Sequence, residues 1–400
     1  MVGKSLLKRV FSQIRGYNFL VRYWDGEEVV YGQGEPDFQL VFCRKPGPVA
    51  KHSDISLLFG EAYTRGDLDI TGDFDAIAKA IEDGDSFFYN KRNFIGKVLK
   101  LAHWRGLKPI KAQQKRNIAA HYDLGNDFFS LWLDPSLSYS CAYFKDPADS
   151  LAIAQDQKID LVLRKAQLKP GMRLLDIGCG WGHLALRAAR DYGVSVLGVT
   201  LSAEQCAAAK ARARQAGLSD QVEIRLENYR DLTAGDGPFD RIVSVGMFEH
   251  VGRPHIPLYL SIIRELLRPG GLSVLHTLTK MKEDAVNGWT AKYIFPGGYI
   301  PSLREIIYTQ AAQELHVLHV ESLRPHYAKT LDLWYDNFSR PEVIDKVRSM
   351  FGEEFVRMWS LYLRMAASFL RTGYLDVHQI VFSSGVARNL PLTLESVYCH

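Results

Sequence analysis

The stretch of sequence that decides the fold is LLDIGCGWGHLALRAA, residues 174–189. Its aliphatic residues predict a strand that ends at Asp176, and a loop with Gly178, Gly180 and Gly182 then opens a helix. Glycine tolerates positive φ and lets a ligand approach the backbone closely. The stretch therefore predicts a strand, a ligand-binding loop and a helix, although loops of this kind occur in several nucleotide-binding folds.

Segments with strand and helix patterns alternate around this loop. We expect strands at residues 173–178, 195–200, 222–227, 239–246 and 271–278, and helices at 151–167, 181–192, 202–216 and 256–267. Strands separated by helices of this length form a parallel sheet that is covered by helices on both faces. The expected fold class is therefore α/β, with a Rossmann-like doubly wound sheet.

The residues around the loop indicate its ligand. Asp176 would repel a pyrophosphate, but it suits the amino group of a methionine moiety. The side chains that could bind a ribose or flank an adenine follow the next two strands; they are Thr200, Ser202, Gln205, Asn228, Tyr229 and Arg230. We therefore expect S-adenosylmethionine (SAM) as the cofactor. A nicotinamide or flavin site is the alternative, and the lack of an acidic residue at the ribose position weakens both hypotheses.

Length and composition limit the class of protein. A chain of 400 residues exceeds the usual size of one domain, so two domains are expected and three are possible. Five scattered cysteines without a C-x-x-C pair argue against a disulfide framework and a zinc site, and no H-x-x-x-H or H-E-x-x-H spacing occurs, so we expect no metal. We also expect neither a signal peptide nor a bilayer-spanning segment, and a reducing cytoplasm fits this pattern.

The N-terminal region has a pattern of its own. Residues 4–14 predict a basic amphipathic helix, which either packs on its own domain or lies on a membrane. Strand-like segments separated by turns follow within residues 18–42. Residues 56–82 then predict a helix, a strand and a second helix. A small α+β domain is therefore expected at residues 1–90.

The segment that joins the two regions is strongly basic. Residues 91–116 contain nine lysines and arginines and no acidic residue, with aliphatic side chains and Trp104 between them. Such a segment suits an anionic lipid surface, where each basic residue contributes about 1 kcal/mol. The alternatives are a solvated basic linker and, less favoured because no recognition motif accompanies it, a nucleic-acid-binding patch.

Several longer blocks carry a family resemblance. They are FGEAYTRGDLDITGD near the N-terminus, AAHYDLGNDFFSLWLDPSLSYSCAYF (119–144), FDRIVSVGMFEHVG (239–252), FPGGYIPSL (295–303), LWYDNF (333–338) and RMWSLYL (357–363). With LLDIGCGWG and GVTLS, they resemble the cyclopropane fatty acyl phospholipid synthases, whose relatives include the mycolic acid cyclopropane synthases. The resemblance covers nearly the whole chain. It implies a SAM-dependent methyltransferase domain at 117–400, a basic linker at 91–116, a lipid-binding domain at 1–90 and a homodimer.

The resemblance also implies two sets of site residues. The implied SAM contacts are Tyr139, Ser140, Gly178, Gly180, Thr200, Leu201, Ser202, Gln205, Asn228 and Tyr229, to which the residue pattern adds Asp176. The implied bicarbonate site consists of Cys141, Glu249, His276 and Tyr335, with backbone help near Leu278. The chain departs from the family at Ala366, where several relatives have cysteine, and this weakens a thiol role there. Tyr229 is tryptophan in the mycolic branch.

The implied reaction transfers a methylene group from SAM to the double bond of an unsaturated phospholipid acyl chain, with bicarbonate as general base. Aromatic side chains could stabilise the carbocation, although core packing is the alternative role for each of them. The candidates are Tyr139, Phe144, Phe248, Tyr293, Phe295 and Tyr299. The expected partner is the bilayer surface rather than nucleic acid, and the expected location is the cytoplasm, peripheral to the inner face of the membrane.

Two other functions remain open at this point. A fatty-acyl C-methyltransferase could use the same residues and yield a methyl or methylene branch. A non-catalytic lipid-binding or SAM-sensing protein is the second alternative, and the intact Cys141, Glu249, His276 and Tyr335 set argues against it. Methylation of RNA or of a small amine ranks lower because no base-stacking motif and no acidic amine pocket is visible.

Overall fold

The computed structural model describes residues 3–46, 55–88, 124–284 and 286–398. The chain forms two compact units. The four-stranded unit comprises residues 1–108, 286–296 and 331–374, and the seven-stranded unit comprises residues 109–285, 297–330 and 375–400. The basic segment 91–116 and the predicted domain boundaries beside it lie outside the described residues, so these boundaries stay predictions.

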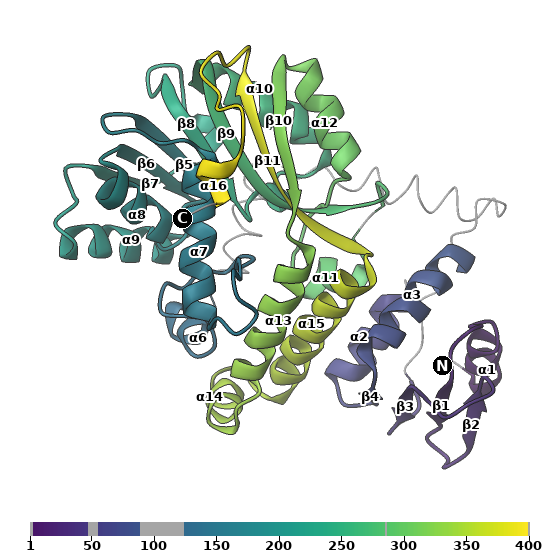
Figure 1. Ribbon diagram of the computed structural model, residues 1–400. Helices are drawn as coiled ribbons and strands as arrows, with labels where there is room; N and C mark the ends of the chain where they lie inside the picture. The colour runs from purple at the N-terminus through teal and green to yellow at the C-terminus, as the bar shows by residue number, and fades with distance from the viewer. Residues whose placement is uncertain (1–2, 47–54, 89–123, 285, 399–400) are drawn as a thin grey trace. The chain divides into compact units, whose positions relative to one another are not determined.

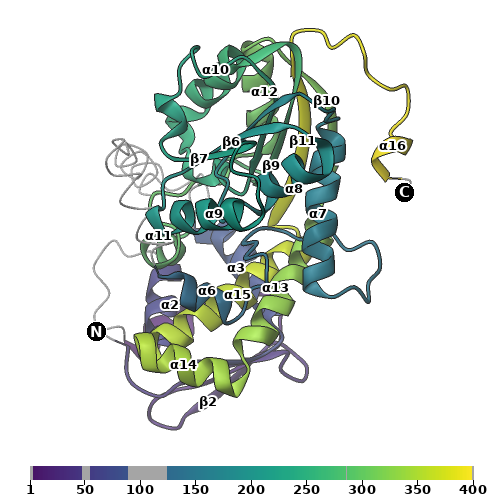
Figure 2. The same cartoon turned by 90° about the vertical axis from the view of Figure 1, so that its left-hand side faces the viewer.

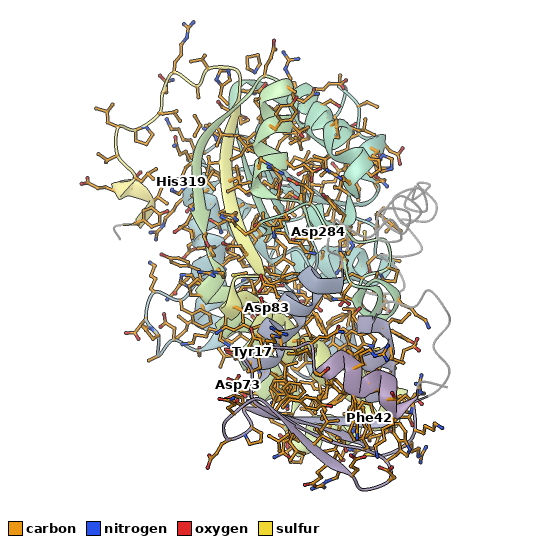
Figure 3. All side chains as sticks on the ribbon, turned by 90° about the vertical axis from the view of Figure 1, so that its right-hand side faces the viewer. Tyr17, Phe42, Asp73, Asp83, Asp284 and His319 are labelled. Carbon is orange, nitrogen blue, oxygen red and sulfur yellow. The ribbon has the colours of Figure 1, made fainter. Side chains whose placement is uncertain are left out.

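The four-stranded unit is built on the sheet β2-β1-β3-β4 (Figure 1). Its strands are β1 Phe19–Arg22, β2 Glu28–Tyr31, β3 Phe38–Phe42 and β4 Leu68–Gly72. β1 pairs antiparallel with β2 and parallel with β3, and β3 pairs antiparallel with β4. Phe42 of β3 lies in the aromatic core, and the Tyr17 hydroxyl donates to Asp83 Oδ2 at 2.7 Å (Figure 3).

Helix α1, Lys4–Phe11, packs against this sheet. Leu7 and Phe11 are buried, and the Phe11 ring lies 5.9 Å from the ring of Phe19. On the polar side of the helix, Lys4 pairs with Asp25 at 2.6 Å and Lys8 pairs with Glu27 at 2.5 Å. The apolar face of this basic helix is therefore covered by its own unit, which is the first of the two alternatives that the sequence left open.

The remaining helices of this unit come from distant parts of the chain. They are α2 Ile55–Thr64, α3 Phe74–Phe88, α11 Gly288–Tyr293, the part of α13 (Arg324–Phe338) from Leu331 onward, α14 Pro341–Phe351 and α15 Glu353–Thr372. Polar contacts fasten these segments: Lys292 and Tyr293 donate to Glu61, and Arg357 donates to the Tyr63 carbonyl and to Asp69. These contacts explain why segments 286–296 and 331–374 belong to the same unit as α2.

The seven-stranded unit has the strand order β10-β11-β9-β8-β5-β6-β7. Its strands are β5 Arg173–Ile177, β6 Ser195–Thr200, β7 Val222–Leu226, β8 Phe239–Val245, β9 Leu267–Lys280, β10 Leu315–Ser322 and β11 Leu375–Ser384. The five predicted strands are present and pair in parallel, whereas β11 pairs antiparallel with both β9 and β10. The predicted α/β class with a Rossmann-like sheet is confirmed.

Helices cover both faces of this sheet. The unit contains α6 Asn126–Ser130, α7 Leu151–Lys165, α8 His183–Tyr192, α9 Ala203–Gln215, α10 Ile256–Leu266, α12 Leu303–Ala312 and α16 Glu395–Tyr398. Leu174 packs with α7, α8 and α9, whereas its neighbour Leu175 packs with α10 and α12. This alternation is the period-two pattern of a strand buried on both faces. Figure 2 shows the same helices and strands from another side.

Among the described residues, no helix combines the length and the apolar character needed to cross a bilayer.

A substitution at Gly60 tests the packing of α2 on α11. A methyl group at Gly60 would collide with the indole ring of the buried Trp289. We expect Gly60→Ala to lower the free energy of unfolding by about 1–3 kcal/mol, measured by denaturant titration. In an unstrained helix the same change stabilises by about 0.5–1 kcal/mol. An increase in stability would therefore contradict this packing, and Gly235→Ala, where nothing closer than the Thr233 hydroxyl meets the added carbon, is the control.

Candidate functional site

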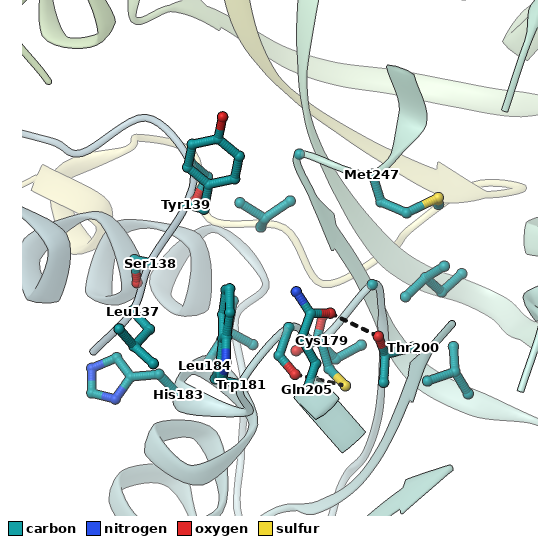
Figure 4. A pocket seen from close by; sticks show the side chains of 18 of the residues that line it. Leu137, Ser138, Tyr139, Cys179, Trp181, His183, Leu184, Thr200, Gln205 and Met247 are labelled. Atoms are coloured by element: carbon teal, nitrogen blue, oxygen red, sulfur yellow. Dashed lines mark hydrogen bonds between the residues drawn. The ribbon is translucent and has the colours of Figure 1, made fainter. Parts of the chain in front are cut away.

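A pocket opens at the carboxyl ends of β5, β6, β7 and β8, where parallel sheets bind ligands (Figure 4). Residues 136–140, which precede α7, form one wall, together with Lys158 and Ile159 of α7 itself. The loop after β5, the start of α9 and the segments after β7 and β8 complete the lining. The strand order places β5 between β8 and β6, so the pocket lies where the chain's crossovers change direction.

The glycines of the loop bring backbone to the pocket, next to the side chains of Cys179 and Trp181. Gly178 has a φ of +84°, and a Cβ there would lie 2.7 Å from the Cβ of Met247. Gly180 has a φ of +54°, and a Cβ there would meet nothing within 4 Å. Gly178 is therefore required by packing, whereas the space beside Gly180 is left open for a ligand.

Two buried charged groups line the pocket. Burial raises the pKa of Asp176 to about 7 and lowers the pKa of Lys158 to about 8, because the low-dielectric interior disfavours both charges. Lys158 donates to the Ser140 hydroxyl at 2.9 Å. A ligand that carries both an ammonium group and a carboxylate could be held by these two groups, and the methionine end of SAM carries both.

Lys158 was not among the predicted site residues. The signal for it was present in the sequence, since Lys158 and Lys165 recur with Ala154 and Leu161 at helical spacing on the buried side of α7. A lysine on an apolar helix face is costly to bury and marks a place where its charge is used.

Most of the predicted cofactor residues line this pocket. Ten of the eleven line the pocket; they are Tyr139, Ser140, Asp176, Gly178, Gly180, Thr200, Leu201, Gln205, Asn228 and Tyr229. Thr200 donates to Gln205 Oε1 at 2.9 Å, and this bond orients the Gln205 amide. Ser202 lies outside the lining, because its hydroxyl caps α9 by accepting a hydrogen bond from the Gln205 amide nitrogen.

Three of the four residues expected to bind bicarbonate converge on Leu278 of β9. Glu249 lies in the short 3-10 helix Phe248–His250 after β8, and its Oε1 accepts a hydrogen bond from the Leu278 amide at 2.6 Å. His276 lies two residues before Leu278, so the two side chains point to the same face of the sheet. Cys141 is buried in a cluster with Val377 and Leu278.

The electrostatic state of these groups follows from their burial. Burial raises the pKa of Cys141 well above its ordinary value, so the thiol stays protonated; it lies 3.1 Å from the Ala142 carbonyl oxygen. Burial also raises the pKa of Glu249, which the hydrogen bond from Leu278 opposes. The pKa of His276 falls to about 3, so its imidazole is neutral.

Two buried atoms of this cluster lack a partner among the described residues. They are Glu249 Oε2 and His276 Nε2. A buried polar atom without a hydrogen bond costs about 1–3 kcal/mol, so such atoms call for a ligand or a water. A bicarbonate ion has a hydroxyl that donates and oxygens that accept, and it therefore fits an acceptor such as Oε2 and a donor such as a protonated ring nitrogen.

Tyr335, the fourth residue of that set, lies on α13 in the four-stranded unit. There it lines a cavity with Phe74, Asp332 and Arg371, and the guanidinium carbon of Arg364 lies 5.4 Å from the centre of its ring.

The six aromatic candidates have different surroundings. Tyr139 lines the pocket at the carboxyl ends of β5 and β6, whereas Phe248 is buried and its ring lies 4.9 Å from the ring of Tyr259 in the core. Tyr299 donates to Glu305 at 2.7 Å. The others contact neighbouring side chains: Phe144 with Lys329, Tyr293 with Glu61, and Phe295 with Tyr362. Tyr139 is therefore the candidate best placed beside a bound methyl donor.

Comparison with known families gives matches over most of the chain. Residues 110–380 match the family described as mycolic acid cyclopropane synthetase, and residues 6–92 match a domain family of unknown function. A Pseudomonas putida protein named "Probable fatty acid methyltransferase" is 36% identical over 390 residues, 94% of this chain and 95% of the relative. The cyclopropane-fatty-acyl-phospholipid synthase of Escherichia coli strain K12 is 46% identical over 274 residues, 68% of each chain.

Solved structures share the same fold. The crystal structure of mycolic acid cyclopropane synthase CmaA1 complexed with SAH and CTAB has a TM-score of 0.63 and 37% sequence identity, and covers 67% of this chain and 98% of its own. SAH is S-adenosylhomocysteine, the product that SAM leaves after methyl transfer.

The buried carboxylate of Asp176 predicts opposite effects on stability and on binding. Its pKa is raised in the folded state, so its contribution to stability is complete below about pH 4 and is lost as the pH rises through about 7. We expect Asp176→Asn to stabilise the ligand-free protein at pH 8 by about 1–3 kcal/mol, measured by denaturant titration, and to weaken SAH binding about 10- to 100-fold, measured by calorimetry.

Asp240→Asn is the matched control for this prediction. Asp240 is also buried, but it lies outside the pocket lining, pairs with Arg268 at 2.5 Å and accepts a hydrogen bond from the Arg173 amide. This variant should lose stability at pH 8 and keep its SAH affinity. Unchanged SAH binding by Asp176→Asn would show that Asp176 does not contact the ligand.

Proposed function

The chain belongs to the mycolic acid cyclopropane synthetase family, and on this basis we propose that it forms cyclopropane rings on the unsaturated acyl chains of membrane phospholipids, with bicarbonate as general base. It is a SAM-dependent methyltransferase, as the sequence blocks predicted, and both the family and the enzyme class are confirmed. The observation that carries the proposal is a pair of buried atoms near Leu278, Glu249 Oε2 and His276 Nε2, which have no hydrogen-bond partner in the described part of the chain.

We assign SAM to the pocket at the carboxyl ends of β5 and β6. Asp176 and Lys158 would hold the ammonium and carboxylate groups of its methionine end, and the open space at Gly180 would take its chain. Asn228 and Tyr229 would flank the adenine, and Thr200 and Gln205 would bind the ribose.

SAM supplies a methyl group on a positively charged sulfur. The alkene's electron pair forms a new bond to the methyl carbon while the carbon–sulfur bond breaks and leaves its pair on sulfur. The acyl chain then carries a cation, and the face of Tyr139 can stabilise it. Removal of a proton from the new methyl group releases the electron pair that closes the ring.

The cluster around Leu278 would hold the base for that proton. Bicarbonate supplies a small base that can be bound from several sides. Glu249 Oε2 would accept a hydrogen bond from its hydroxyl, and His276 would donate to one of its oxygens. Cys141 keeps its proton because burial raises its thiol pKa, so it contributes packing or a weak hydrogen bond rather than a thiolate.

A second product is compatible with the same site. The Pseudomonas putida relative, which aligns over 94% of this chain, is named a probable fatty acid methyltransferase, and a fatty-acyl C-methyltransferase would leave a methyl or methylene branch. Only the fate of the cation differs between the two reactions. Incubation with SAM and vesicles of unsaturated phospholipid, followed by mass and NMR analysis of the fatty acids, distinguishes the ring from the branches.

Glu249→Gln tests the proposed base. Gln keeps the size of Glu249 but loses its charge and its better acceptor, so the ion would be misplaced. Because general-base catalysis contributes about 10²–10⁴-fold, we expect a large loss of turnover in the vesicle assay and unchanged SAH affinity by calorimetry. Added bicarbonate should partly restore activity. Normal turnover of this variant in bicarbonate-depleted buffer would refute the base while leaving the methyltransferase class intact.

The proposed membrane contact depends on the basic segment 91–116, since the apolar face of α1 is covered by its own unit. We expect binding to anionic vesicles that weakens with salt, because exposed charges are screened over about 10 Å at 0.1 M. Replacing Lys97, Lys100, Arg105 and Lys108 by Gln should weaken vesicle sedimentation and leave SAH affinity unchanged. A control that replaces Lys4 and Lys8 should have a smaller effect, because both are already paired with carboxylates. Equal vesicle binding by the wild type and the four-residue variant would make the segment a linker only.

A further inference from the structure

A row of hydrogen-bonded side chains lies behind His276. Gln379 of β11 is the direct cross-strand partner of His276, and Glu321 of β10 is the cross-strand partner of Gln379. Gln379 Nε2 lies 3.1 Å from His276 Nδ1. Lys165, the last residue of α7, donates to Gln379 Oε1 at 2.7 Å and also pairs with Glu321.

The chemistry of the groups fixes the direction of every bond in this row. Lys165 is in an ion pair with Glu321, and an ammonium group can only donate. Gln379 must therefore present its oxygen to Lys165 and its NH₂ group to His276. An amide NH₂ donates, so His276 Nδ1 is the acceptor and carries no proton.

The proton of the imidazole must then be on the other nitrogen. His276 is neutral, because burial and the nearby positive charges of Lys158 and Lys165 lower its pKa to about 3. A neutral imidazole has one N–H, and Nδ1 is already an acceptor. The N–H is therefore at Nε2, the buried atom that has no partner among the described residues.

We propose that Lys165 and Gln379 are positioning residues that hold His276 in the tautomer protonated at Nε2, so that the ring donates a hydrogen bond to the bound anionic base. This role rests on the proposed function of the cluster around Leu278. The opposite tautomer would present a lone pair to the anion, which repels it. Lys165 and Gln379 act through His276 and need not touch the anion themselves.

The burial of Lys165 supports this role. Its side chain is 1% exposed, and burial lowers its pKa. A buried ion pair gains little over well-packed apolar residues of similar volume. Stability alone therefore does not account for a lysine at this position, whereas control of an amide's orientation requires a group that can only donate.

The first test is made on the wild-type protein. The ¹⁵N chemical shifts of the two ring nitrogens identify the tautomer of a histidine, and the signals of His276 among the 12 histidines are assigned by comparison with His276→Gln. We expect His276 to be protonated at Nε2 in the absence of ligand, and its Nε2 signal to shift on addition of bicarbonate. A wild-type His276 protonated at Nδ1 would overturn the proposal.

The second test changes the row of hydrogen-bonded side chains behind His276. In Gln379→Glu the carboxylate accepts from both Lys165 and His276, so the imidazole proton moves to Nδ1. Because one charge-assisted hydrogen bond is lost, the bicarbonate concentration for half-maximal activity should rise about 10- to 100-fold, with SAH affinity unchanged. Lys165→Met frees the amide to turn over and should give a mixture of tautomers with a smaller rise. Unchanged tautomers and unchanged bicarbonate dependence in both variants would overturn the proposal.

Gln310→Glu is the matched control, because Gln310 is equally buried, on α12, and outside the row of hydrogen bonds. It should keep the His276 tautomer and the bicarbonate dependence of the wild type. The outcomes also separate this proposal from the proposed function. If His276 is protonated at Nε2 but neither its NMR signal nor the activity of the enzyme responds to bicarbonate, the proposed base is wrong. The control of the tautomer by Lys165 and Gln379 would still stand.

Discussion

The constraint on which the rest of the seven-stranded unit depends is that its sheet is buried on both faces, so every polar side chain inside it needs a partner. The apolar residues of β5 alternate between the two hydrophobic clusters, which leaves the carboxyl ends of the strands as the region where polar groups can gather. Asp176 and His276 lie there with almost no exposed surface, and the Oε2 atom of the half-buried Glu249 is buried as well. The packing that fixes the positions of these three side chains therefore also makes their charged forms unfavourable.

Burial shifts the pKa of each group in a definite direction. Burial raises the pKa of Asp176 to about 7, and burial together with the positive charges of Lys158 and Lys165 lowers the pKa of His276 to about 3, so both groups move toward their neutral forms. For Asp176 this is a penalty that a cationic ligand can remove, since an ammonium group beside the carboxylate restores its charge. In our proposal the neutral form of His276 is the useful one, because it has a single ring proton whose position the hydrogen bond with Gln379 determines. Burial therefore leaves Asp176 able to regain its charge when a cationic ligand binds, and it keeps His276 neutral.

The sequence predicted the parts of the structure that local pattern determines. The strand, glycine loop and helix at 174–189 were predicted because aliphatic runs and glycines have few alternatives, and ten of eleven predicted cofactor residues line the pocket. Strands β10 and β11 were not predicted, since an antiparallel pair added from the C-terminal region leaves no β-α-β alternation to recognise. Ser202 was expected at the ligand but caps α9, because a serine before a helix suits either role. The inclusion of segments 286–296 and 331–374 in the four-stranded unit depends on long-range contacts such as Lys292 with Glu61, which no local pattern records.

Helix α7 contributes a lysine both to the pocket assigned to SAM and to the surroundings of His276, and its sequence alone suggests this only weakly. Lys158 and Lys165 are seven residues apart, close to two helical turns, so both project from the same side of the helix. Lys158 reaches Ser140 beside the pocket assigned to SAM, and Lys165 reaches Gln379 behind His276. Both charges also act at a distance, since each lowers the pKa of His276. One helix therefore places two buried cations so that Lys158 lines the pocket assigned to SAM and Lys165 lies behind His276, the residue that we propose holds the base, and a tilt of this helix would disturb both together.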